Sequence, residues 1–175
     1  YRVDDLAELA VRLRSPVIYD RRGDVLWFWD GQGGIDFFNI TGSMPGSSWE
    51  ISAFYALCGF YTLKIETGGG GVSYVDIAFD LQYPEKDVYG VSMCFLPVNT
   101  FGDARLHMFL YDGSYGYEAA IKYSEEERKL YYRDENQNWI EVASGINIMS
   151  TNLHHNFMKL VADFVNEKYL RMIFN

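Results

Sequence analysis

The sequence predicts an all-β protein of antiparallel strands with one short helix near its N-terminus. Aromatic residues make up 17% of the 175-residue chain, and such side chains suit the half-buried surface of a pleated sheet. About eleven short apolar runs follow one another roughly every 8–15 residues, with Gly, Asn, Asp or Pro between most of them, which is typical of a β-sandwich or barrel. No helical pattern separates these runs, which argues against a parallel α/β sheet.

The one helical pattern lies at residues 3–14. Apolar residues recur there at helical spacing, Asp5 and Glu8 can form a capping box, and Pro16 ends the segment. We expect residues 1–23 to form this helix and its lead-in, and residues 24–175 to form one β-sandwich domain. Strands are expected at 25–29, 49–54, 59–66, 74–82, 89–96, 104–111, 115–123, 128–133, 139–143, 156–165 and 168–174.

Alternation along each run predicts which side chains face the core, because successive residues of a strand point to opposite sides. In the run at 104–111, Leu106, Met108 and Leu110 share one side, and the other side carries charge and aromatic rings. A slip of one residue would bury the charged side, so this register is strongly favoured. The core side of the last two strands is expected to consist of Met158, Leu160, Ala162, Phe164, Leu170, Met172 and Phe174.

The segment from Asp112 to Asn175 resembles the C-terminal half of the concanavalin A-like lectin/glucanase and laminin-G jelly rolls. The resemblance lies in the succession YDG, YEAAIKY, KLYYRDENQNW, FMKLVADF and KYLRMIFN, and the upstream GDVLWFWD is similar to the opening strand of secreted bacterial members. It implies an antiparallel jelly-roll β-sandwich over most of residues 24–175, with a concave sheet that often holds carbohydrate and, in several relatives, a structural calcium ion. The strands that end the family's fold are not found after the last matching residue, so we expect a piece of a longer bacterial protein with flanking domains, located outside the cell or on its surface.

Composition argues against several classes of partner. The net charge of −9 and the pI of about 4.7 disfavour binding to nucleic acid or to an anionic membrane surface. No run of about 18 apolar residues exists, so no membrane-spanning helix is expected. Cys58 and Cys94 lie in apolar runs, where two buried thiols or one bridge between strands both fit.

The chain carries no catalytic signature. The resemblance to glucanases would imply a cluster of the form E-x-D-x-(x)-E on one strand, and the sequence has none. Asp76 and Asp80 share a strand face but lie about 13 Å apart, too far for the carboxylate pair of a glycosidase. A hydrolase would therefore need carboxylates from separate strands, and a protein that is not an enzyme fits the sequence better.

Metal binding has one candidate set. Zinc is disfavoured, because the adjacent His154 and His155 would point to opposite sides of a strand. A structural calcium ion could take oxygen ligands from Asp30, Asp112 and Asp163, and ordinary turn aspartates fit the same pattern. No other cofactor is predicted.

The charged and aromatic side of the strands supplies the candidate binding residues. Sugars stack on exposed rings, while charged groups bind their hydroxyls. The leading hypothesis is a non-catalytic carbohydrate-binding module; the alternatives are a structural or protein-interaction domain without a sugar site, and a glycoside hydrolase. The predicted ligand-binding residues are Asp76, Arg105, His107, Tyr111, Tyr117, Tyr131 and Trp139.

Overall fold

The computed structural model describes residues 26–27, 29, 31, 33–42, 46–56, 61–68, 73–81, 85–98, 102–148 and 155–174. These residues form eleven strands with antiparallel pairing and no helix, which confirms the predicted all-β class. The predicted helix at 3–14 and the predicted boundary between residues 23 and 24 lie outside the described residues. In the part of the chain that is described, no helix is long and apolar enough to cross a membrane. The chain divides into two compact units, residues 1–81 and 82–175.

The N-terminal unit contains two small sheets. β1 (Asn39–Gly42) pairs with β4 (Val75–Ala78), and β2 (Ser48–Ser52) pairs with β3 (Thr62–Glu66). The sequence did not predict β1, because its residues NITG show no apolar alternation.

The strand predicted at 25–29 is wrong at its described positions, Leu26, Trp27 and Trp29, which lie in no strand. The rings pack locally instead. Trp27 stacks on Phe79 with ring centroids 4.1 Å apart, and the Trp29 indole N–H donates to the Gly34 carbonyl at 3.0 Å.

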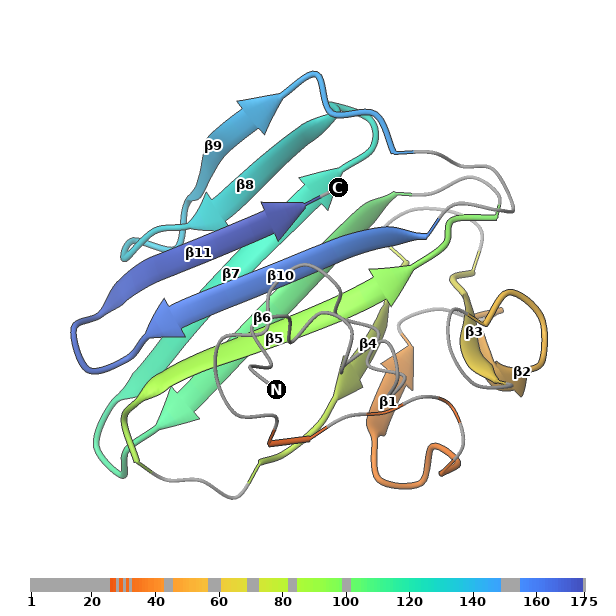
Figure 1. Cartoon of the computed structure of the whole chain (residues 1–175), viewed down its shortest axis with the longest axis horizontal. Helices are drawn as coiled ribbons and strands as arrows, with labels where there is room; N and C mark the ends of the chain where they lie inside the picture. The colour runs from red at the N-terminus through yellow and green to blue at the C-terminus, as the bar shows by residue number, and fades with distance from the viewer. Residues whose placement is uncertain are drawn as a thin grey trace, which may run out of the picture. The chain divides into compact units, whose positions relative to one another are not determined.

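The C-terminal unit consists of two antiparallel sheets. Strands β5 (Val88–Phe95), β10 (Asn156–Asp163) and β11 (Lys168–Phe174) form one sheet in the order β11-β10-β5. Strands β6 (Asp103–Tyr111), β7 (Gly116–Ser124), β8 (Lys129–Arg133) and β9 (Trp139–Ser144) form the other in sequence order. The first sheet crosses over the second (Figure 1), so this unit is sandwich-like.

The core lies between these two sheets. β6 contributes Leu106 and Leu110, β7 contributes Ile121, and β10 contributes Met158 and Leu160. Each such side chain stabilises the fold by roughly 1.5–3 kcal/mol when it is fully buried. The predicted core sides of 104–111 and 156–165 are therefore confirmed.

β11 departs from the predicted alternation. A β-bulge pairs Val161 with Arg171 and Ala162 with Tyr169, so Leu170 has no partner on β10. One extra residue interrupts the alternation, so the side chains before the bulge point to the side opposite to the one that the pattern after it predicts. Tyr169 therefore packs against the core with Met172 and Phe174, whereas Leu170 is exposed, and the core prediction for Leu170 is wrong.

Candidate functional site

The four-stranded sheet carries polar and aromatic side chains on the side away from the core, here called the outer face. Burial alternates strictly along β6, and the cross-strand register extends this side over β7, β8 and β9. It includes five predicted binding residues, namely Arg105, His107, Tyr111, Tyr131 and Trp139. The other members include Asp103, Phe109, Glu118, Ala120, Lys122, Lys129, Arg133 and Glu141.

The Trp139 side chain lies across this face. Neighbouring strands are about 4.8 Å apart, so the backbones of β9 and β6 are separated by roughly 14 Å in a flat sheet. The Trp139 ring centroid nevertheless lies 6.3 Å from the His107 ring and 5.8 Å from the guanidinium carbon of Arg105, both on β6. Ala120, which pairs with His107, is small and fully buried. A small residue there leaves room for the indole to reach over β8 and β7.

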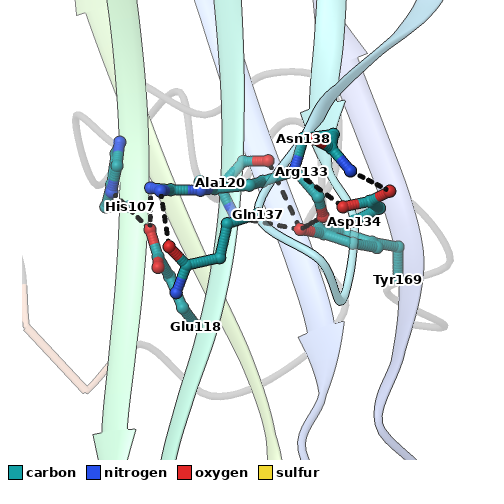
Figure 2. Close-up of polar contacts among 8 residues, drawn as sticks. All are labelled: His107, Glu118, Ala120, Arg133, Asp134, Gln137, Asn138 and Tyr169. Carbon is teal, nitrogen blue, oxygen red and sulfur yellow. Dashed lines mark hydrogen bonds and ion pairs between the residues drawn. The ribbon is translucent and has the colours of Figure 1, made fainter.

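A carboxylate joins three strands beside this indole. Glu118 Oε1 lies 2.8 Å from Arg133 Nη1 and 3.2 Å from His107 Nδ1, and Arg133 Nη2 donates to Gln137 at 3.4 Å (Figure 2). The Nε atom of Arg133 is buried without a hydrogen-bond partner. The network holds the guanidinium in place and leaves one of its donors unused.

Lys122 occupies the middle of the face. Its ammonium nitrogen lies 4.7 Å from the Tyr131 ring centroid and 5.3 Å from that of Trp139. Tyr131 is buried, and its hydroxyl donates to Glu127 at 2.6 Å, a bond that raises the pKa of the phenol. Tyr131 therefore supports Lys122 and offers little surface of its own to a ligand.

Three exposed rings lie at and beside the β6–β7 hairpin. Phe109 is 71% exposed, Tyr111 60% and Tyr115 70%. The Phe109 ring lies over Gly116, where an added Cβ would be only 2.9 Å from its Cζ atom. The Tyr111 hydroxyl donates to the Gly113 carbonyl at 3.0 Å. Phe109 was not among the predicted binding residues, although the alternation of its strand placed it on this face.

Tyr169 supports the site from the opposite sheet. Pairing between β7 and β8 ends at Ile121 and Tyr132, so the next backbone groups have no ladder partners. The Tyr169 hydroxyl accepts a hydrogen bond from the Ala120 N–H at 3.1 Å and donates to the Arg133 carbonyl at 2.6 Å (Figure 2). Burial raises the pKa of this phenol, so it keeps its proton. No sequence signal identified Tyr169, because the bulge turns it toward the core.

Two predicted binding residues lie elsewhere. Asp76 is on β4 of the N-terminal unit, opposite Thr41. Tyr117 packs against the core side of β7, and its hydroxyl donates to Asp112 Oδ2 at 3.2 Å. Lys86 contacts the same pair, with its Nζ 3.4 Å from Asp112 Oδ2.

The predicted calcium ligands Asp112 and Asp163 cap turns. Asp112 Oδ1 accepts the N–H groups of Ser114 and Tyr115 at 2.9 Å each, and these bonds lower the pKa of the carboxyl to about 2. Asp163 accepts hydrogen bonds from Asn166 and has a lowered pKa for the same reason. Asp30 lies outside the described residues, and within those that are described no group of three or more His, Cys, Asp or Glu could hold a metal ion.

One of the two cysteines lies in the described part of the chain. Cys94 is half-buried on β5, between Met93 and Phe95, which pack against the core. Cys58 lies outside the described residues. The two buried thiols and the single bridge therefore both stay predictions.

No protein-family model, no curated protein and no solved structure matches this chain. The outer face of the four-stranded sheet is the site on which a functional proposal can be built.

Proposed function

We propose that this chain is a non-catalytic carbohydrate-binding module of the jelly-roll type, and that the outer face binds the glycan. The observation that carries this proposal is the combination of exposed rings and ordered polar groups on one sheet. Phe109, Tyr111 and Tyr115 offer apolar ring surface to the C–H groups of a sugar. The Glu118–Arg133–His107 network offers donors and acceptors to its hydroxyl groups.

The rigidity of the sheet supports this assignment. Groups on paired strands are held in place before a ligand arrives, so less conformational entropy is lost on binding than with groups on loops. Phe109 and His107 belong to β6, and Glu118 belongs to β7, to which β6 is paired along its whole length. Contiguous exposed apolar patches are typical of interaction surfaces, and the exposed rings of Phe109, Tyr111 and Tyr115 lie at and beside one hairpin.

Glu118 and Asp103, the two carboxylates that pair with the cations around Trp139, are too far apart to act as a glycosidase pair. Glu118 pairs with Phe109, six positions along β6 from Asp103. Six positions correspond to roughly 20 Å, whereas a glycosidase pair needs about 5–9.5 Å. Glu118 Oε1 is also engaged by both Arg133 and His107. The extracellular location, the flanking domains and the structural calcium ion stay predictions.

A glycan array probed with the full chain, followed by calorimetry on the glycans that bind, tests the proposal. We expect Phe109→Ala to weaken binding by about fivefold, since an aromatic contact contributes about 1 kcal/mol. Phe54→Ala is the matched control, because Phe54 is 74% exposed and lies in the N-terminal unit. Unchanged binding by Phe109→Ala would mean that the outer face is not the site. Absence of binding to any glycan would leave the interaction-domain hypothesis.

A further inference from the structure

We infer that the outer face prefers an acidic glycan, and that Arg105 and Lys122, beside Trp139, form the subsite for its anionic group. The anionic group is a carboxylate or a sulfate ester, since both present the negatively charged oxygens that these cations bind. This inference rests on the proposed function and adds the charge of the ligand to it.

Two like charges are paired across neighbouring strands of the outer face. Arg105 on β6 is the direct cross-strand partner of Lys122 on β7. Like charges in this position destabilise a sheet. The single carboxylate of Asp103 forms ion pairs with both cations: its Oδ2 lies 3.1 Å from Arg105 Nη2 and 3.9 Å from Lys122 Nζ. An anion bound between the two cations would remove the remaining repulsion.

The cations around Trp139 have hydrogen-bond donors that lack acceptors. The Lys122 side chain is only 15% exposed, and among the described residues its ammonium has two ring faces and the distant Asp103 carboxylate as neighbours. An ammonium carries three donors. The Nε atom of Arg133, whose guanidinium carbon lies 5.7 Å from the Trp139 ring centroid, is also buried without an acceptor.

The charge around the Trp139 ring is locally positive. Arg105, Lys122 and Arg133 all lie within 5.3–5.8 Å of the Trp139 ring centroid. Two carboxylates, Asp103 and Glu118, pair with these three cations. Glu141, the third carboxylate of the face, pairs instead with Lys129, whose Nζ lies 2.7 Å from Glu141 Oε2. The excess is therefore positive in a chain whose net charge is −9. At physiological salt, charges more than about 8 Å away are largely screened, so the local excess decides which ligand is attracted.

A purely structural role for these cations makes a different prediction. If Arg105 served only to stack on Trp139, its removal would lower the stability of the fold. If Arg105 and Lys122 mainly repel each other, the melting temperature of Arg105→Gln should equal or exceed that of the parent chain. Binding of the acidic glycan would then fall without any loss of stability, which a purely structural residue would not show.

The test measures binding of the full chain to three probes by calorimetry. The probes are an oligouronate, the same backbone with its carboxylates reduced to alcohols, and a sulfated derivative of the reduced backbone. We expect one of the acidic probes to bind at least about tenfold more tightly than the reduced one. Tighter binding of the oligouronate identifies a carboxylate subsite, and tighter binding of the sulfated derivative identifies a sulfate subsite.

Substitutions of Arg105 and Lys122 test whether these two residues cause the preference for an acidic probe. Arg105→Gln and Lys122→Gln should each weaken the acidic probe about tenfold and leave the reduced probe unchanged. Lys168→Gln, which removes one charge from β11 in the other sheet, should change neither. Should Lys122→Gln lower the melting temperature, Arg105→Gln still decides the question, because the Arg105 side chain is half exposed.

The failure of the inference differs from the failure of the proposed function. Equal binding of acidic and reduced probes, or full binding of the acidic probe by Arg105→Gln, overturns the acidic subsite and leaves glycan binding intact. A chain that binds none of the three probes and no glycan on the array overturns both.

Discussion

Replacing Tyr169 by Phe removes one hydroxyl from the place where β7 and β8 separate. That hydroxyl is the partner of the Ala120 N–H and the Arg133 carbonyl, at 3.1 and 2.6 Å. Ala120 is fully buried, so water cannot replace the hydroxyl there. A buried polar group left without a partner costs about 1–3 kcal/mol, and we expect Tyr169→Phe to lower the free energy of unfolding by about 2 kcal/mol. The ring itself stays packed against Tyr132, so no cavity opens.

Thermal and urea unfolding of the full chain measure this change. For a chain of 150–250 residues, 1 kcal/mol shifts the melting temperature by roughly 2–4 °C, so a shift of about 4–8 °C is expected. Tyr115→Phe removes a hydroxyl from a ring that is 70% exposed, and should change the stability by less than about 0.5 kcal/mol. Hydrogen exchange of the Ala120 amide should accelerate in Tyr169→Phe. Equal stability of the two variants would refute the assignment of the hydroxyl as a substitute for the missing strand pairing.

Three further predictions concern the turn, the exposed ring and the core. The stability that Asp112 contributes should be present above about pH 4 and lost as the pH falls toward its folded-state pKa of about 2. The stability of Asp112→Ala should therefore decrease less between about pH 4 and about pH 2 than that of the parent chain, as measured by circular dichroism of unfolding. Gly116→Ala places a methyl 2.9 Å from the Phe109 ring, which must move; the fold should persist while glycan affinity falls, and an unchanged affinity contradicts the role of that ring. Met158→Ala should lower the free energy of unfolding by about 2–5 kcal/mol in urea, because Met158 is fully buried, and a loss below about 1 kcal/mol would contradict its place in the core.

Much of the C-terminal unit could be predicted from alternation alone. The runs at 104–111 and 156–165 bury the side chains that the pattern assigned to the core. The same pattern placed Arg105 and His107 on the opposite side, where they lie. Turn residues such as Asp112 also predicted the β6–β7 hairpin at the position where the structure has it.

The errors have identifiable physical causes. The strand expected at 25–29 had the composition of a strand, but Trp27 packs on Phe79 outside any sheet. Leu170 fitted the alternation of β11, but a bulge in the pairing with β10 turned it outward. A bulge depends on how two strands meet, and neither strand shows it in its own residues.

The sequence by itself determined the class of the protein and the two sides of its main strands, because the period of two is a property of each strand and requires no knowledge of its neighbours. Tertiary structure decided which residues meet across strands. The pairing of Arg105 with Lys122, the reach of Trp139 across the sheet, and the insertion of Tyr169 between β7 and β8 all join residues from different strands. Such contacts depend on strand order and register, which are set by packing of the whole unit.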